Sequence, residues 1–357
     1  MGSAWHTFRC RSHLLLIGHA RLTTRGHPGI QSPLPTPLAR RKPTPLLVAL
    51  LAVFVGIAVL AVAADQFVIG AARVALIKNV PSLVVGVVII GFGTSAPEIL
   101  VSALAALDDQ PDVAVGNIIG SNIANLSLLL GIGAMIVPLA VDSRTVRREA
   151  LMVVGAVALF GIFVQGGGVN RVEGIILLVA MAAALYVITR SQTGDPLGPE
   201  TAEFADAIHH RFGPEVGRTV IGLVLTVASG RLLLWGALDL ADRAGLSAGF
   251  VGATLVSIGT SLPELVTVIQ SARRSETDLM VGNLLGSNLF NALAAGGIVG
   301  LIGAPRFDDT SLTTIAATAA VVVAVAATVS MRTGLRVTRV EGGLLALAYV
   351  VIVPLLI

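Results

Sequence analysis

Two octapeptides of the chain carry side chains that could bind a cation: GFGTSAPE at residues 91–98 and SIGTSLPE at residues 257–264. Each lies in a run of apolar residues and ends in a glutamate that follows a proline. If these runs cross a membrane, an ionised carboxylate at their centre costs roughly +3 kcal/mol on insertion scales. A bound cation would offset that cost, so Glu98 and Glu264 are the first candidates for an ion-binding site.

The proline in each octapeptide predicts a departure from regular helix. Proline has no backbone N–H, and its ring clashes with the carbonyl four residues earlier, which belongs to Gly93 or Gly259. We therefore expect a kink or a short unwound turn in each motif. Such backbone is tolerated at membrane depth only where protein buries it or where it lines a wet cavity. Thr94 and Glu98 are four residues apart, so their oxygens can share a face.

A second pair of motifs, GNIIGSNIAN at 116–125 and GNLLGSNLFN at 282–291, supplies further oxygen atoms. Within the first copy Ser121 and Asn125 are four residues apart and share a helix face. Carboxylates, hydroxyls, amides and freed carbonyls are hard ligands, and calcium takes six to eight such oxygens at about 2.3–2.6 Å. Copper and zinc are poorly served, because the one cysteine and all six histidines fall in the N-terminal tail or the central polar segment.

Both motif pairs recur at the same spacing. Their second copies follow 166 residues after the first, and Asp112 and Gly86 recur at that offset as Asp278 and Gly252. The tetrapeptide RVEG at residue 171 recurs at residue 339. One duplicated unit therefore covers most of the chain beyond the tail.

The composition is that of an integral membrane protein, since 55% of the 357 residues are hydrophobic and only 13% are charged, against about 25% charged in soluble domains. A spanning helix needs about 20 mostly apolar residues. The sequence predicts ten such spans, at about 46–65, 82–107, 113–137, 149–165, 172–190, 218–241, 248–272, 279–303, 311–330 and 340–357.

The predicted fold is an all-α membrane protein of ten transmembrane helices in two five-helix repeats, with helices 2 and 7 broken. Because five is odd, the second repeat must enter the membrane inverted, which is a common plan of secondary transporters with a site near the midplane. The predicted parts are a disordered basic tail (1–45), the first repeat (46–190), a cytosolic loop (191–217) and the second repeat (218–357).

Lysine and arginine in the loops predict the orientation. One alternating set of loops, which includes the central one, carries 13 of these residues and the opposite set carries three. The rich set should be cytosolic, with both termini outside. The tail, with seven basic and no acidic residues, would by itself favour the inside, but the internal loops agree with one another and receive more weight. These basic residues set topology, so no nucleic-acid partner is expected.

The four motif copies, in register, resemble the α-repeats of the cation/calcium exchanger superfamily, and most closely its prokaryotic sodium/calcium exchangers. The resemblance spans roughly residues 46–357. It implies exchange of sodium for calcium across the plasma membrane by alternating access, with calcium exported and both ions bound as transported substrates. No cofactor, enzymatic activity or obligatory protein partner is implied.

The resemblance also implies roles for particular residues. Glu98 and Glu264 would bind calcium, with Thr94 and Thr260 beside them. Main-chain oxygens near Gly91 and Ser257 would help to bind sodium, and Asn125 and Asn291 would complete the centre. Four serines would also contribute to sodium binding: Ser95, Ser261, Ser121 and Ser287.

One departure from the family bears on the coupling ion. Some members have aspartate where this chain has Asn291, so the site holds two carboxylates rather than three. That ligand set resembles the proton/calcium branch of the superfamily, although that branch uses a different motif around its glutamate. A proton/calcium antiporter, with a buried glutamate carrying the proton, is therefore the alternative. The central loop lacks a large insert, so no separate calcium-sensing domain is expected.

Two other classes of function rank lower. A cation channel usually places its filter on a symmetry axis of subunits, which nothing in the sequence suggests. An intramembrane enzyme with a Ser–His pair is excluded by the histidine positions, and an aspartyl dyad is unsupported because only Asp65 lies in or near a span. Asp65 and Arg231 share the 166-residue offset, which predicts an ion pair between the halves.

Overall fold

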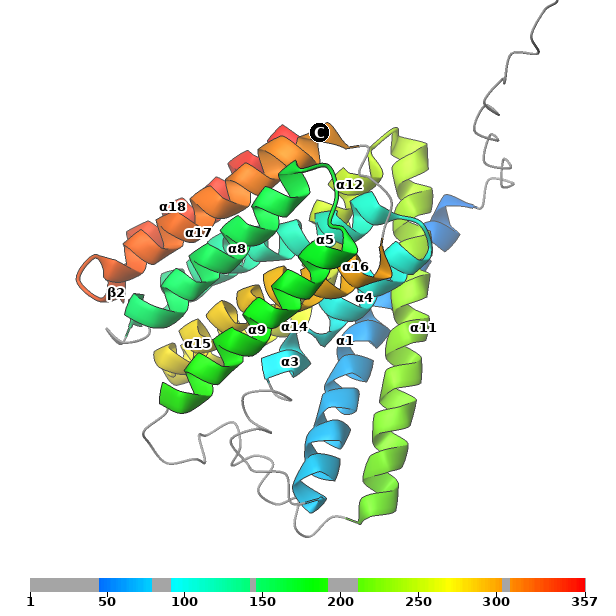
Figure 1. Ribbon diagram of the computed structural model, residues 1–357, viewed down its shortest axis with the longest axis horizontal. Coiled ribbons are helices and arrows are strands. Elements are labelled where there is room, and N and C mark those ends of the chain that lie inside the picture. The colour runs from blue at the N-terminus through cyan, green and yellow to red at the C-terminus, as the bar shows by residue number, and fades with distance from the viewer. Residues whose placement is uncertain (1–44, 79–90, 142–145, 192–210, 304–308, 357) are drawn as a thin grey trace, which may run out of the picture. The chain divides into compact units, whose positions relative to one another are not determined.

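The structure is a computed structural model that describes residues 45–78, 91–141, 146–191, 211–303 and 309–356. The described chain is almost entirely helical (Figure 1). The predicted tail, the first part of the predicted span 82–107 and most of the predicted loop 191–217 lie outside the described residues.

The first half contains both long and interrupted helices. Its elements are α1 (Leu46–Ile77), α3 (Gly91–Thr94), α4 (Ala96–Leu107), α5 (Pro111–Ala124), the π-helical segment η2 (Asn125–Leu129), α6 (Leu130–Ile136), β1 (Leu139–Ala140), the π-helical segment η3 (Val146–Ala150), α8 (Leu151–Gln165) and α9 (Arg171–Ser191).

The second half follows the same plan. Its elements are α11 (Phe212–Ala244), α12 (Ala248–Val251), the π-helical segment η5 (Gly252–Val256), α13 (Ser257–Thr260), α14 (Leu262–Arg274), α15 (Thr277–Leu289), the π-helical segment η6 (Phe290–Ala295), α16 (Gly296–Ile302), the π-helical segment η7 (Leu312–Ala316), α17 (Ala317–Arg332), β2 (Arg336–Val337), α18 (Arg339–Ile352) and the short 3₁₀ turn η8 (Val353–Leu356). Helices α11, α14, α15 and α16 each begin 166 residues after α1, α4, α5 and α6. The sequence repeat is therefore also a repeat of local structure.

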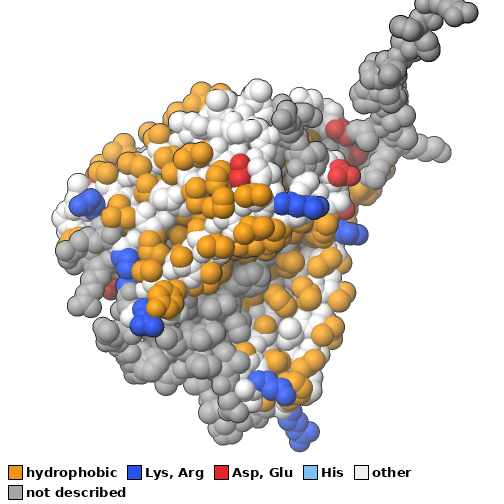
Figure 2. Space-filling model, in the orientation of Figure 1, with side chains coloured by type: hydrophobic (Ala, Val, Ile, Leu, Met, Phe, Trp, Pro, Cys, Tyr) orange, Lys and Arg blue, Asp and Glu red, His pale blue; other side chains and the backbone are white. Residues whose placement is uncertain are grey.

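The helices are long and apolar enough for a membrane protein. Within the described residues, eight helices could cross a membrane by length and composition, or nine if the bent pair Ala248–Thr260 and Leu262–Arg274 forms one span. Helix α4 is apolar but shorter than a span. Figure 2 shows a face on which hydrophobic side chains predominate and charged ones are few, as suits a surface in contact with lipid.

The paired helices α1 and α11 are longer than the sequence predicted. Helix α1 has 32 residues and ends at Ile77 rather than near residue 65, because the apolar pattern resumes after Asp65 and Gln66. Helix α11 has 33 residues and begins at Phe212 rather than at residue 218. The two pack closely: a Cβ placed on Gly56 would lie 2.9 Å from the backbone nitrogen of Leu233.

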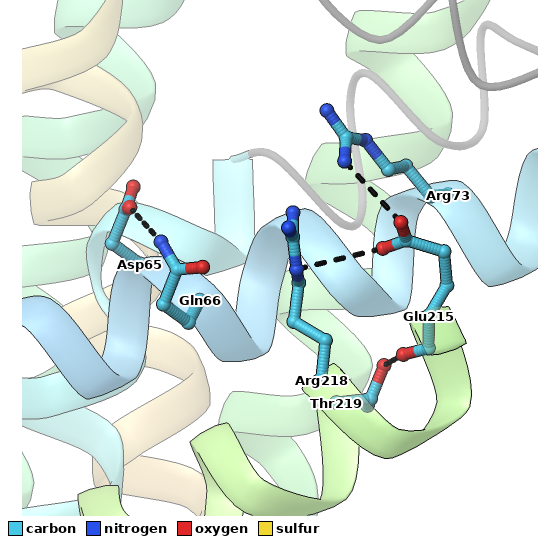
Figure 3. Close-up of polar contacts among 6 residues, drawn as sticks. All are labelled: Asp65, Gln66, Arg73, Glu215, Arg218 and Thr219. Atoms are coloured by element: carbon cyan, nitrogen blue, oxygen red, sulfur yellow. Dashed lines mark hydrogen bonds and ion pairs between the residues drawn. The ribbon is translucent and has the colours of Figure 1, made fainter. Parts of the chain in front are cut away.

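The predicted pair between Asp65 and Arg231 is wrong. Asp65 accepts a hydrogen bond from the Nε2 of its neighbour Gln66 at 3.0 Å (Figure 3), while Arg231 lies 3.9 Å from the carboxylate of Asp108. A shared offset makes two positions equivalent in the two halves but does not place them in contact.

A different ion-pair cluster joins one end of α1 to the start of α11. The Glu215 carboxylate, 5% exposed, lies between Arg73 at 3.3 Å and Arg218 at 3.7 Å (Figure 3). At the same end, the Lys78 ammonium lies 4.6 Å from the centroid of the Phe212 ring. The end of the first long helix and the start of the second are thus held side by side.

Contacts between loops group other helix ends. The strands β1 and β2 pair antiparallel, with Leu139 opposite Val337, so the end of α6 lies beside the connection between α17 and α18. Elsewhere the backbone N–H of Asp309 donates to Asp112 at 3.3 Å, and Ser247 donates to Asp309 at 2.6 Å. Each set of contacts identifies loops that lie on one side of the molecule.

Candidate ion-binding site

A short break separates α3 from α4 at Ser95, and an equivalent break separates α13 from α14 at Ser261. Ser95 separates α3 from α4 with φ −91° and ψ 4°, and Ser261 separates α13 from α14 with φ −84° and ψ 9°. The second interruption bends the helix by 47°. The prolines lie in the first turns of α4 and α14, where a missing N–H removes no intrahelical hydrogen bond. In each half the interruption lies two residues before the proline.

Each interruption places a glutamate in the first turn of the following helix. Glu98 is in the first turn of α4 and Glu264 is in the first turn of α14, and both side chains are fully buried. The N-terminal end of a helix carries partial positive charge and favours a carboxylate. The helix ends therefore stabilise a negative charge on either side chain.

The two carboxylates have few hydrogen bonds. The Ser261 hydroxyl donates to Oε1 of Glu98 at 3.0 Å, and this bond joins the two halves. Oε2 of Glu98 and both oxygens of Glu264 have no hydrogen-bond partner among the described residues. The two side chains are also close enough for the charge of Glu98 to act on Glu264. Buried carboxylate oxygens without partners are costly, and they are the ligands that a hard cation prefers.

Hydroxyl groups connect the interruption of the first half to the second motif of the other half. The hydroxyls of Thr94 and Ser287 are 3.1 Å apart, and either could donate. The Ser95 hydroxyl donates to the main-chain oxygen of Ser287 at 3.5 Å. Helix α15 packs against α3, so Thr94, Ser95 and Ser287 form one group.

The interruption of the second half makes different contacts. Thr260 donates either to Oδ1 of Asn117 at 3.2 Å or to the main-chain oxygen of Ser257 at 3.1 Å. The Ser257 hydroxyl donates to the carbonyl of Ala253 at 2.8 Å. The main-chain carbonyl of Ser257, and not its hydroxyl, is the group that contacts Thr260. Helix α5 packs against α13, which makes this the reciprocal contact between halves.

The two predicted asparagines lie in π-helical segments. Asn125 begins η2 and Asn291 is the second residue of η6, and both are fully buried. Neither carboxamide nitrogen nor oxygen of either residue has a hydrogen-bond partner among the described residues. Segment η6 packs against α4 and η2 packs against α14, so each asparagine lies on an element in contact with a glutamate helix. Single π-turns often occur at functional sites.

Two predicted residues, Ser121 and Gly91, remain to be placed. The Ser121 hydroxyl is fully buried and unpaired within the described structure. Gly91 begins α3, the short helix before the interruption at Ser95. Within the described residues, no three histidine, cysteine, aspartate or glutamate side chains form a group that could hold a metal. The cluster is therefore a set of two carboxylates with neutral oxygens.

The sequence reasoning missed Asn117. Its carboxamide contacts Glu98, Ser102 and Thr260 in the interior. The asparagine after the first glycine of GNIIGSN recurs in GNLLGSN as Asn283, and that repetition was the available signal.

Comparison with known proteins identifies relatives of the whole helical unit. A family model described as sodium/calcium exchanger protein matches residues 48–190 and 215–357. The chain is 37% identical to a putative antiporter, CaxA, of Alkalimonas amylolytica, over 85% of this chain and 97% of the relative. It is 32% identical to the inner membrane protein YrbG of Escherichia coli, over 74% of this chain and 82% of the relative.

A solved structure has the same fold. The sodium-calcium exchanger NCX_Mj, soaked with 2.5 mM Na⁺ and 1 mM Sr²⁺, superposes with a TM-score of 0.57 at 26% sequence identity. The match covers 85% of this chain and 97% of that structure.

Proposed function

Because the chain belongs to the sodium/calcium exchanger family of multi-pass membrane antiporters, we propose that it exports calcium across the plasma membrane in exchange for sodium, by alternating access. The observation that carries this proposal is the pair of fully buried glutamates, one from each half. Three of their four carboxylate oxygens have no hydrogen-bond partner in the part of the chain that the structure describes. Calcium and sodium are substrates of this site, and the proposal requires no cofactor.

The oxygen set suits both substrates. Two carboxylates balance the charge of one calcium ion, and the neighbouring hydroxyls and amides can complete a coordination shell of six to eight oxygens. Sodium carries half that charge, so more than one sodium ion is needed to neutralise the same pair. The proposal includes neutral ligands from three groups of residues. They are the side chains of Thr94, Thr260, Asn125 and Asn291, the four predicted serines, and the main-chain carbonyls near Gly91 and Ser257.

Exchange follows from the sharing of Glu98 and Glu264. If both ions bind to these two carboxylates, calcium and sodium compete for them and cannot be fully bound at the same time. An empty site leaves two like charges buried together, which is unfavourable. The halves would then change access chiefly when ions neutralise the site, and this couples the two fluxes.

The proposed membrane topology has ten spans in two inverted repeats. Loop contacts support it. The Arg73–Glu215 pair joins the end of α1 to the start of α11, and β1 pairs with β2. The charge pattern assigns all four of these segments to the cytosolic side. The Asp112–Asp309 contact joins loops assigned to the outside. The central loop is then cytosolic and the C-terminus is outside.

A proton-coupled calcium antiporter is the second candidate. The observation that favours it is the neutral side chain of Asn291, which leaves Glu98 and Glu264 as the two carboxylates of the candidate site. A glutamate that takes up a proton would lose its charge and release calcium without any sodium.

Calcium flux in proteoliposomes tests the proposal. The purified full chain is reconstituted, voltage is fixed, and either a sodium gradient or a pH gradient is imposed. The proposal predicts calcium movement that follows the sodium gradient and ignores the pH gradient. Calcium movement driven by the pH gradient alone would support the proton-coupled antiporter instead. Calcium movement that follows neither gradient would overturn both candidate functions.

A further inference from the structure

Asn117 lies where the two halves meet beside the glutamates, and its carboxamide is fully used. Its Nδ2 donates to the main-chain oxygen of Glu98 at 3.2 Å and to the Ser102 hydroxyl at 2.9 Å. Its Oδ1 accepts from the Thr260 hydroxyl at 3.2 Å. All four residues are fully buried. One side chain of α5 therefore ties the glutamate turn of the first half to the threonine of the second.

The chemistry of these partners fixes the direction of each hydrogen bond. A main-chain carbonyl can only accept, so the nitrogen of the Asn117 amide must face Glu98, and the oxygen must face Thr260. Thr260 must then donate, either to Asn117 or to the carbonyl of Ser257. With its proton committed to these acceptors, the Thr260 oxygen has its lone pairs available for a cation.

The equivalent residue of the second half, Asn283, is different. It is partly exposed, and its Nδ2 has no hydrogen-bond partner among the described residues. The position equivalent to Ser102 is Val268, which has no hydroxyl to accept from an amide. The three-way contact of Asn117 therefore has no complete counterpart at Asn283, where the hydroxyl that Ser102 supplies is missing.

We propose that Asn117 is a positioning residue for ion binding: it orients the Thr260 hydroxyl toward the cation and holds the turn of α4 that bears Glu98. This inference rests on the proposed function, since it assigns Asn117 a role at the site of transport. Asn117 touches the ligands and not the ion, so its effect passes through Thr260 and Glu98.

This role can be tested by measuring the calcium concentration that gives half-maximal flux in proteoliposomes. Asn117→Leu keeps a similar volume and removes all three hydrogen bonds. Because the variant loses all three hydrogen bonds, we expect the half-saturating calcium concentration to rise at least about fivefold, with a smaller change in maximal rate. Asn283→Leu is the matched control and should shift it less than about twofold.

A double-mutant cycle separates positioning from general damage. Thr260→Val removes the hydroxyl that Asn117 orients, so Asn117→Leu should have a clearly smaller effect in that background than in the wild type. Equal effects in the two backgrounds would overturn the role through Thr260, and an unchanged half-saturating concentration in Asn117→Leu would overturn the proposal as a whole. Asn117→Ser, a smaller polar substitution, replaces Asn117→Leu in every arm if the leucine variant fails to fold.

Failure of the role assigned to Asn117 can be distinguished from failure of the proposed function. Wild-type calcium flux driven by sodium or by pH allows the comparison, because the half-saturating calcium concentration is defined in either case. A wild type with no calcium flux under either gradient rejects the proposed function, and with it the role assigned to Asn117.

Discussion

Glu98 and Glu264 occupy equivalent positions in the two halves, yet their surroundings differ. Glu98 accepts from Ser261, and its main-chain oxygen accepts from Asn117. The carboxylate of Glu264 has no hydrogen bond within the described structure. A duplicated motif thus gives two buried carboxylates but not two identical sites. The comparison suggests that the halves contribute unequally to one shared ion site.

The differences are local and can be traced to named positions. Ser102 supports Asn117 in the first half, and Val268 replaces it in the second. Thr94 contacts Ser287, whereas its counterpart Thr260 contacts Asn117. Each interruption therefore contacts the other half through a different residue of the second motif.

The largest effect is expected from removal of either charge. Glu98→Gln and Glu264→Gln should each abolish calcium transport, because a neutral amide cannot balance half the charge of calcium. Both variants should be expressed and remain monodisperse on gel filtration, since the amide has the same shape and removes the cost of a buried charge. Normal calcium flux in either variant would remove that glutamate from the site.

The next effect should distinguish the two serines at the interruptions. Ser261→Ala removes a hydrogen bond of 3.0 Å to the Glu98 carboxylate, whereas Ser95→Ala removes only a contact of 3.5 Å to a carbonyl. Bonds to charged groups contribute about 1.5–3 kcal/mol, so Ser261→Ala should raise half-saturating calcium about tenfold or more. Ser95→Ala should change it by a smaller factor. Equal shifts in the two variants would show that the asymmetry of the hydrogen bonds does not govern calcium affinity.

A milder effect is expected at the serines of the second motif. Ser121→Ala and Ser287→Ala should chiefly raise the sodium concentration needed for half-maximal exchange, because these hydroxyls are proposed sodium ligands. Ser287 also contacts Thr94, while the Ser121 hydroxyl is unpaired within the described residues. The Ser287 variant should therefore lose more thermal stability as well. If calcium affinity alone changed in both, the assignment of these serines to sodium would be wrong.

The smallest effect is expected far from the site, at the exposed pair of Arg231 and Asp108. The two side chains are 60% and 49% exposed and 3.9 Å apart, and exposed pairs contribute about 0–1 kcal/mol. Arg231→Ala should leave calcium flux and the melting temperature within error of the wild type. A large loss of flux would reveal a role for this arginine that its position does not suggest.

Much of the architecture could be predicted because membrane burial leaves strong signals. Apolar runs predicted a helical membrane protein, which agrees with the span-length apolar helices of the described residues. The proline-glutamate pairs predicted a departure from regular helix near Ser95 and Ser261. The extension of α1 to Ile77 was missed because Asp65 and Gln66 resembled the end of a span. Polar residues in a long helix need not end it when the helix pairs with a neighbour such as α11.

The details of the site depend on packing that the sequence does not display. Neither motif predicts the π-helical segments that contain Asn125 and Asn291. Asn117 and Asn283 have the same sequence neighbours, GN followed by an apolar pair, yet only Asn117 meets Ser102. The pairing of Asp65 with Arg231 failed for the same reason, because equivalence in a repeat carries no information on distance.

The central claim is that Glu98 and Glu264 form one calcium site shared by the two halves. Equilibrium binding of radioactive calcium to the purified full chain, to Glu98→Gln and to Glu264→Gln tests it most directly, with sodium added as a competitor. The account predicts calcium binding to the wild type that sodium displaces, and loss of that binding in both variants. Retention of wild-type calcium binding in either variant would contradict the account, because each half would then hold its ion without the other.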